Sequence, residues 1–381
     1  MKYLPIFLYC ISIINLIKVK PKIIMNHNLI FIFWYWIVTF IVWIIILPFF
    51  IKFVIRLRLW KQIREEATIW KAKLFSKLHQ GKNWTPTMWW AAILGIVIFM
   101  VLASVIIQKL WYTNNSLVNQ KETFLSLFTL VAIWFVWLVD DYMNVREIWR
   151  TKWLSARFKM FWLLLFAAAW AFWFYYKLWW NVTDEMWHFI RTLKMPFLWD
   201  LEIWIFFIPV FVFIIVAGAN SVNITDWLDW LAGWLLLFAY SVYAYITYDQ
   251  WLLLLTTLCI VTIWALLAFL WYNVKPAKIY MWDVWSLALW ANLGIMAMLT
   301  NTMIIFIIVT SVFIFETLSV IMQLTSKKFR NWKKVFLIAP FHHHLEALWW
   351  KEENVVFRLW LIWILLSAIW IITYIIQAHG V

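Results

Sequence analysis

The chain has 381 residues, of which 66% are hydrophobic and only 13% are charged. A soluble domain keeps roughly a quarter of its residues charged, so this composition excludes an ordinary soluble globular protein. The formal net charge of +14 does not indicate nucleic-acid binding, because the basic residues lie in short loops between apolar runs, where they report membrane orientation.

Apolar runs such as Leu29–Ile51 and Val356–Ile376 are long enough to cross a hydrocarbon core of about 30 Å as helices. Unbroken apolar runs without strict alternation favour helices over a barrel. The sequence therefore predicts an all-α polytopic membrane protein with about ten transmembrane helices, in a single domain over residues 25–381. The expected spans are 29–53, 88–108, 122–139, 160–179, 203–219, 231–247, 251–271, 285–300, 302–323 and 356–376.

The first 24 residues are placed outside this domain as an N-terminal extension. Three interpretations stay open: a signal-like segment, an additional helix, or an upstream start with Met25 as the first residue. Cys10 and Cys259 both lie in apolar surroundings, and we expect neither a disulfide nor a metal role for them.

Lys and Arg are concentrated in alternate connections between the expected spans. The connections at 55–87, 140–159, 272–284 and 324–355 are rich in them, whereas the connection near 181–200 carries acidic residues. Basic loops stay in the cytoplasm, so the odd-numbered connections are expected there. We expect the bacterial cytoplasmic membrane, with both termini on its outer side.

Trp occurs 36 times in the chain and Gly only 6 times. Average glycine usage of about 7% would give roughly 27 residues, and Trp stands in polar turns where a residue of positive φ is expected, such as 226–230 and 281–285. Some bacterial lineages read the UGA codon as glycine and others as tryptophan. We therefore hypothesise that many Trp letters stand for Gly; a UGG codon at Trp282 would contradict this for that position.

The odd-numbered connections also carry unusual polar residues, and this convergence on one membrane face predicts an active site. Asp140 and Asp141 directly follow the expected span 122–139. Ionisable residues in a membrane segment are functional suspects, and this pair can bind Mg²⁺ or accept a proton. The alternative is a hydrated helix end, although two carboxylates there oppose the helix dipole.

Two further connections carry acidic and amide side chains. Asp226 and Asp229 are three residues apart, so on a helix they face the same side; helix capping is the alternative, but it does not account for all the polar residues at 220–229. Asp283 lies between two Trp letters at the start of an apolar helix, which suits a phosphate and its metal. An N-cap role is the alternative.

The last of these segments holds three consecutive histidines, His342, His343 and His344. A structural zinc site is the alternative, but adjacent side chains on a helix do not face one another and the sequence has no second cluster of Cys or His. The segment 81–88, with Lys82 and Thr85, is weaker, because a helix start capped by Thr85 explains it equally well.

These segments together resemble the bacterial phospho-N-acetylmuramoyl-pentapeptide transferase family, within the polyprenyl-phosphate sugar-phosphate transferases, from about Leu59 to Ile376. The resemblance lies in GKNWTPTMWW, LVDDY, LSARFK, NSVNITDWLDWLA, YNVKPAKIYMWDVWSLALW and APFHHHLE. The family pattern has Gly at many of the Trp letters, which supports the codon hypothesis. These positions are Trp84, Trp89, Trp90, Trp227, Trp230, Trp282, Trp285 and Trp290.

The resemblance implies that the chain transfers phospho-MurNAc-pentapeptide from UDP-MurNAc-pentapeptide to undecaprenyl phosphate, giving lipid I and UMP, with Mg²⁺ as cofactor. It implies a homodimer as well. It also implies that Asp283 is the main metal ligand and that Asp140 and Asp141 assist. Catalytic roles then fall to Asp140, Asp141, Asp283, His342, His343 and His344, and substrate-binding roles to Lys82, Thr85, Asn220, Asn223, Asp226, Asp229, Asn273 and Tyr280.

Two other functions stay open. A relative within the superfamily transfers GlcNAc-1-phosphate instead, but the PFHHHLE form of the histidine motif favours the muramoyl-pentapeptide branch. A membrane transporter also carries polar residues among its helices. That function predicts charges near the middle of the bilayer, whereas here they gather at helix ends.

Overall fold

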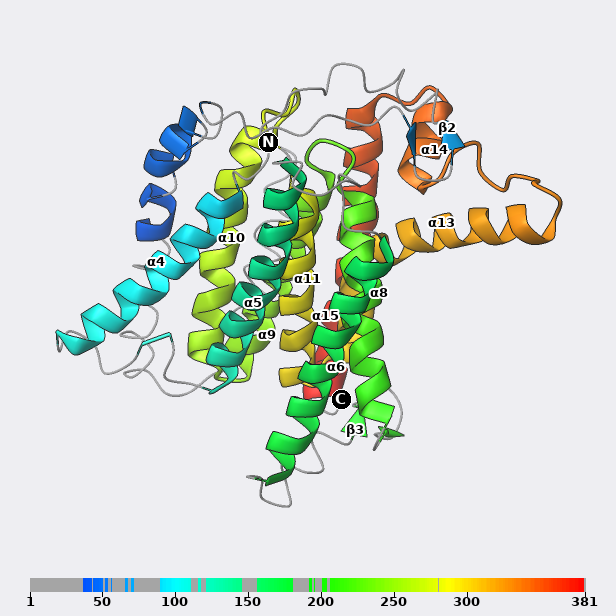
Figure 1. Cartoon of the computed structure of the whole chain (residues 1–381). Coiled ribbons are helices and arrows are strands. Elements are labelled where there is room, and N and C mark those ends of the chain that lie inside the picture. The colour runs from blue at the N-terminus through cyan, green and yellow to red at the C-terminus, as the bar shows by residue number, and fades with distance from the viewer. Residues whose placement is uncertain are drawn as a thin grey trace, which may run out of the picture.

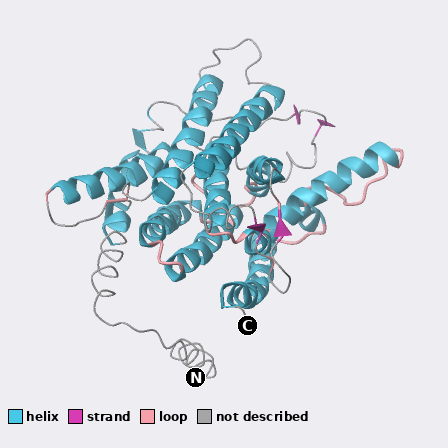
Figure 2. Ribbon diagram, turned by 90° about the horizontal axis from the view of Figure 1, so that it is seen from below, coloured by secondary structure: helices cyan, strands magenta, loops and turns pink. Residues whose placement is uncertain are grey.

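The computed structural model describes residues 37–42, 44–50, 52–53, 56, 66–67, 70–71, 90–110, 116–117, 121–145, 156–180, 192–193, 195, 201–203, 206–279 and 281–379. Most of this chain is helical, and the strands are short (Figure 2). The N-terminal extension 1–24 and the site residues Lys82, Thr85 and Tyr280 lie outside the described residues.

The helices run in a bundle whose long members lie side by side (Figure 1). Their bounds are α4 Trp90–Lys109, α5 Lys121–Val145, α6 Ala156–Trp180, α8 Phe207–Thr225, α9 Leu231–Asp249, α10 Leu253–Asn273, α11 Trp282–Leu299, α12 Met303–Val309, α13 Ser311–Phe329, α14 Phe341–Ala347 and α15 Glu352–His379. Two antiparallel pairs of short strands complete the described elements. In one, β1 (Glu66–Ala67) pairs with β2 (Trp70–Lys71), and in the other β3 (Thr192–Leu193) pairs with β4 (Leu201–Glu202).

Each of the ten expected spans contains a helix of the structure. Among the described residues, four helices are long and apolar enough to cross a membrane, or five if the bent pair α12 and α13 is one span. Five shorter apolar helices lie in the regions of the other expected spans, and the prediction of ten spans stays a prediction: Ile37–Phe50, Val97–Lys109, Thr123–Phe135, Leu163–Phe172 and Ser286–Leu299. The structure thus confirms a helical protein with several membrane-spanning segments.

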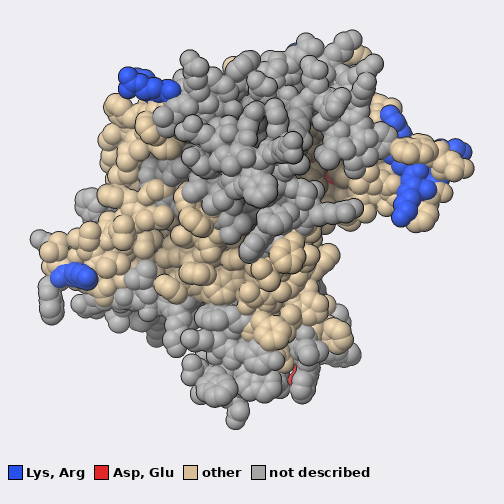
Figure 3. Space-filling model, in the orientation of Figure 1, with Lys and Arg blue, Asp and Glu red and all other residues tan. Residues whose placement is uncertain are grey.

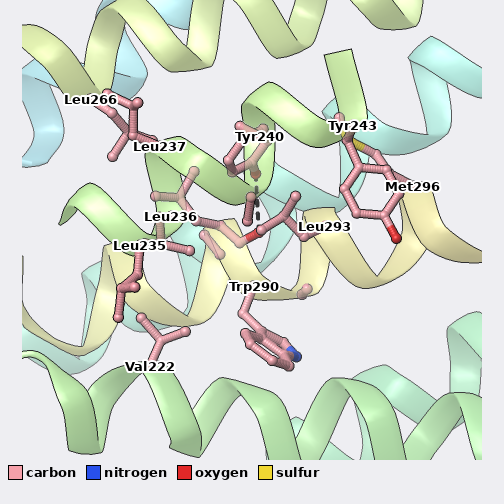
Figure 4. Packing of buried hydrophobic residues seen from close by; sticks show 14 of the residues in the cluster. Val222, Leu235, Leu236, Leu237, Tyr240, Tyr243, Leu266, Trp290, Leu293 and Met296 are labelled. Carbon is pink, nitrogen blue, oxygen red and sulfur yellow. Dashed lines mark hydrogen bonds between the residues drawn. The ribbon is translucent and has the colours of Figure 1, made fainter. Parts of the chain in front are cut away.

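Helix α11 lies at the centre of the bundle and packs against α5, α8 and α9. Its Trp290 is only 2% exposed, and the indole N–H donates to the carbonyl of Ile214 at 3.0 Å. A Cβ on Gly218 would lie 1.6 Å from that ring, so glycine is needed at 218 for the indole to fit. Figure 4 shows Trp290 among the aliphatic side chains of α8, α9 and α11, close to Val222 and Leu293.

The helix in the expected span 302–323 is bent. The chain breaks at Thr310, and α12 and α13 meet at 71°. The Thr310 hydroxyl donates to the carbonyl of Phe306 at 2.6 Å, a bond of the kind that bends helices. The carbonyl of Val309, next to the break, accepts from the indole of Trp363 on α15 at 2.8 Å. As a result α13 points away from the bundle (Figure 1).

The helical spacing expected for Asp226 and Asp229 was also wrong. Helix α8 ends at Thr225, α9 begins at Leu231, and a turn separates them. Trp230 has φ 74°, in the left-handed region, and this conformation cannot continue a right-handed helix. The two carboxylates therefore lie on a turn rather than on one helix face.

Candidate functional site

Three of the polar segments predicted from the sequence meet at one end of the bundle. The backbone N–H of Trp230 donates to Oδ1 of Asn273 at 2.9 Å, which ties the α8–α9 turn to the end of α10. The N–H of Ala277 donates to Oδ2 of Asp229 at 3.2 Å, a second tie between the same connections. The rings of Trp227 and His343 lie 6.4 Å apart, so the histidine segment joins this end too.

Asn273 holds two connections in place with both ends of its amide. Oδ1 accepts from Trp230, and Nδ2 donates to the carbonyl of Ile279 at 2.7 Å. The side chain is buried, with 2% exposure. Because a buried amide is costly unless it is hydrogen-bonded, this arrangement fixes the α10–α11 loop against the α8–α9 turn. The predicted contact of Asn273 with substrate stays a prediction.

Asp229 is similarly buried, at 4% exposure. Its carboxylate accepts from Ala277, and its own backbone N–H donates to Oε1 of Glu352 at 2.9 Å. The first turn of α15 is thereby joined to the same site. Asp226 caps α8 and is half-buried beside this turn, with its N–H donating to the carbonyl of Val222.

The other two polar residues predicted in this segment lie on the last turns of α8. Both Asn220 and Asn223 are half-buried. The amide nitrogen of Asn220 donates back to the carbonyl of Val216 at 2.8 Å. The predicted substrate roles of Asn220, Asn223, Asp226 and Asp229 are not tested by these contacts and stay predictions.

An ion-pair cluster, formed by Lys275, Glu352 and Glu353, borders the site. Nζ of Lys275 lies 3.1 Å from Oε2 of Glu352 and 2.9 Å from Oε1 of Glu353. Partial burial lowers the pKa of Lys275, but its hydrogen bond to Glu353 and the charge of Glu352 outweigh burial, so the pKa lies above that of a free lysine. The cluster fastens the α10–α11 loop to α15.

The three histidines lie on the short helix α14, and each has a different partner for Nδ1. His342 pairs with Glu316 of α13 at 3.1 Å, and His343 pairs with Glu346 at 2.6 Å. Nδ1 of His344 accepts from the backbone N–H of Leu337 at 3.2 Å. Within the described part of the chain, no group of three His, Cys, Asp or Glu side chains could hold a metal ion.

The predicted metal ligands fall at helix ends where only the backbone is described. Asp283 is in the first turn of α11, and Asp140 and Asp141 are near the end of α5. These two helices pack against each other, and Asn292 of α11 donates to Ser126 of α5. The side chains of the three aspartates lie outside the described residues.

Sequence reasoning missed several residues that hold the site together: Glu316, Lys275, Glu352 and Glu353. One signal was available, because Glu316 is the only charged residue in the run 302–326, and a charge in an apolar span is a functional suspect. The other three stand among ordinary charged loop residues, so nothing in their local sequence distinguishes them.

Comparisons with known proteins identify the family of the chain. The model of glycosyl transferase family 4 matches residues 123–301. A phospho-N-acetylmuramoyl-pentapeptide-transferase of Geobacillus sp. (strain WCH70) is 34% identical over 335 residues, 87% of this chain and 94% of the relative. Relatives of the same description from Geobacter sp. (strain M21) and Thermodesulfovibrio yellowstonii are 37% and 32% identical. The match to the Geobacter protein covers 77% of this chain and 81% of the relative. The match to the Thermodesulfovibrio protein covers 86% of this chain and 88% of the relative.

Proposed function

Because the chain belongs to the phospho-N-acetylmuramoyl-pentapeptide-transferase family, we propose that it transfers phospho-MurNAc-pentapeptide from UDP-MurNAc-pentapeptide to undecaprenyl phosphate. The products are lipid I and UMP. The observation that carries the proposal is the meeting of three polar connections, around Asp229, Asn273 and His343, at one end of an apolar bundle. A phosphoryl-transfer site requires such a gathering of polar groups beside a region that accepts a lipid.

In the proposed reaction, an oxygen of the lipid phosphate attacks the sugar-linked phosphorus of the donor. The new P–O bond forms as the bond to UMP breaks, and direct attack is favoured over a covalent intermediate. The contribution of the chain is to position two anionic substrates. The braced turn at 226–230 and the loop at 274–279 offer a rigid frame for this, because buried side chains fix both of them.

Mg²⁺ is the proposed cofactor, held by Asp283 with Asp140 and Asp141. Carboxylate oxygens are the protein ligands that this ion prefers, and α11 packs against the helix that carries the other two aspartates. The ion would neutralise the diphosphate and the departing UMP. His342, His343 and His344 are proposed to act on the sugar-phosphate side of the donor.

The proposed topology has ten spans, with the site on the cytoplasmic face of the bacterial inner membrane. The described helices supply an apolar segment for every span. The last turn of α13 and the turn after it are strongly basic, and Lys and Arg gather over that end of the molecule in Figure 3, as cytoplasmic segments do. The basic residues there are Lys327, Lys328, Arg330, Lys333 and Lys334. A homodimer is proposed as well, in line with the resemblance.

The test is formation of lipid I by the purified chain with and without an intact Asp283. The Asp283→Ala protein is expected to fold, with an unchanged elution volume and melting temperature, but to make no lipid I at any Mg²⁺ concentration. EDTA is expected to abolish activity in the parent, and added Mg²⁺ to restore it. An active, Mg²⁺-dependent Asp283→Ala protein would contradict the metal assignment.

A further inference from the structure

We propose that Glu316 is a positioning residue of this transferase, which holds the His342 imidazole with a proton on Nδ1 and so reserves Nε2 for the substrate. The inference rests on the proposed function. It concerns a side chain on α13, the helix that follows the break at Thr310, acting on a side chain of α14 that is 26 residues further along the chain.

The first step is the burial of Glu316. Its side chain has 0% exposure, and it is the only charged residue between positions 302 and 326. Taking a carboxylate out of water costs several kcal/mol, so its presence here calls for a compensating role. Oε2 meets both the backbone N–H of His342, at 3.2 Å, and the ring Nδ1 of His342, at 3.1 Å. Both contacts are to one residue.

The second step assigns the proton on the ring. A backbone N–H can only donate, so Oε2 of Glu316 acts as an acceptor. Nδ1 of His342 then donates to the same oxygen, and Nδ1 carries a proton whether the imidazole is neutral or charged. Nε2 is therefore the nitrogen left to meet another group. Fixing of the ring by a carboxylate on the opposite nitrogen is the arrangement that orients reactive histidines elsewhere.

The third step is the state of the two remaining atoms. Nε2 of His342 and Oε1 of Glu316 are buried and have no hydrogen-bond partner in the described part of the chain. Buried polar atoms in proteins are nearly always paired. Nε2 is thus a polar atom held ready at the end of the bundle where the histidine segment meets the α8–α9 turn. We assign it a polar group on the sugar-phosphate part of the donor.

The two neighbouring histidines have other Nδ1 partners than His342 has. The rings of His342 and His343 lie 4.2 Å apart, but His343 pairs with Glu346 of its own helix. His344 receives a backbone N–H on Nδ1, which leaves its Nε2 as the donor in the neutral ring. His342 is held by a carboxylate from another helix, Glu316 of α13. The triplet is therefore three differently prepared imidazoles.

The experiment measures kcat/KM for UMP release in Glu316→Leu, Glu316→Gln, His342→Ala and the double variant Glu316→Leu/His342→Ala, with melting temperatures for all. Loss of a supporting partner typically costs 10- to 100-fold, so we expect Glu316→Leu to lose about 30-fold. Glu316→Gln is expected to stay within about fivefold of the parent, because its amide oxygen accepts both N–H groups. In the His342→Ala background, Glu316→Leu is expected to cost less than about twofold more.

The control is Glu346→Leu, which removes the carboxylate paired with His343 and is expected to keep its own effect in the His342→Ala background. Equal losses from Glu316→Leu in both backgrounds would show a merely structural role and overturn the proposal. Full activity of Glu316→Leu, or a Glu316→Gln protein as poor as Glu316→Leu, would overturn it as well. Should Glu316→Leu not fold, Glu316→Asp takes its place, because the shorter side chain withdraws the oxygen from Nδ1 and the same coupling is expected. A parent protein without UMP release would refute the proposed function instead.

Discussion

Three exposed tryptophans stand in backbone conformations that favour glycine, and replacing them is expected to stabilise the protein. Trp251, Trp332 and Trp349 have φ of 60°, 67° and 67°. Trp251 and Trp349 each follow the last turn of a helix, and two backbone hydrogen bonds close that turn at each of them. The N–H of Trp251 donates to the carbonyl of Tyr248, and the N–H of Leu252 donates to that of Thr247. In the same way, the N–H of Trp349 donates to the carbonyl of Glu346, and the N–H of Trp350 donates to that of Leu345. This is the Schellman motif, whose left-handed position is usually glycine and sometimes asparagine. Asn301 occupies the equivalent place after α11.

The magnitude follows from backbone conformation and exposure. A left-handed conformation costs a residue with a Cβ about 1 kcal/mol or more relative to glycine. The three indoles are 57%, 67% and 91% exposed, so their removal forfeits little apolar burial. The gains in unfolding free energy at the three positions are expected to add, which gives about 3 kcal/mol for the triple glycine variant. At about 2.1 cal/mol/K of unfolding entropy per residue, this corresponds to a rise of about 4 °C in melting temperature.

The assay is thermal unfolding in detergent, followed with a thiol-reactive dye in a Cys10→Ser background. The remaining thiol, Cys259, is buried with 0% exposure and reacts only on unfolding. The control is the triple alanine variant, which removes the same indoles but keeps a Cβ. It is expected to gain little. Trp230 is left unchanged, because its ring stacks on Trp360 at 6.0 Å and its removal would lose packing. A triple glycine protein no more stable than the alanine control would refute the reasoning. UGG codons at these three positions would contradict the codon hypothesis there.

Two further variants test the frame of the site. Asn273→Leu leaves the N–H of Trp230 and the carbonyl of Ile279 unpaired, at about 1–3 kcal/mol each; the melting temperature is expected to fall by several degrees, and an unchanged value would contradict the bracing role. Lys275→Met removes an ion pair that raises the pKa of Lys275, so its stabilisation is present below the pKa of a free lysine, about 10.4, and is lost as the pH rises through the higher folded pKa. The melting temperature of Lys275→Met is therefore expected to lie below that of the parent at pH 8 and to approach it as the pH rises through the raised pKa of Lys275. A difference that stays constant with pH would contradict the ion-pair account.

Much of the helical architecture could be predicted from the sequence, because the length of an apolar run and the position of basic loops are local properties. The break at Thr310 could not, since a threonine within an apolar run is equally compatible with a straight helix. A contact beside the break, from the indole of Trp363 to the carbonyl of Val309, joins residues 54 apart. Local sequence likewise gave the polar residues of the α8–α9 connection but not the turn that Trp230 imposes on them.

The sequence predicted which segments form the candidate site, but not how their side chains contact one another. The sequence identified the segments of Asp229, Asn273 and His342, and the structure brings these three segments together. It did not indicate that both ends of the Asn273 amide form hydrogen bonds with backbone groups, or that Glu316 pairs with His342. Such pairings depend on how distant helices pack, which no local pattern encodes. The roles of Asp140, Asp141 and Asp283 stay predictions.

The measurement that tests the central claim most directly is the donor preference of the purified chain, read as UMP release with Mg²⁺ and undecaprenyl phosphate. UDP-MurNAc-pentapeptide and UDP-GlcNAc are compared at equal concentrations. The account predicts UMP release with the first donor and little or none with the second. A preference for UDP-GlcNAc would move the chain to the GlcNAc-1-phosphate branch, and an absence of release from either donor would contradict the transferase assignment itself.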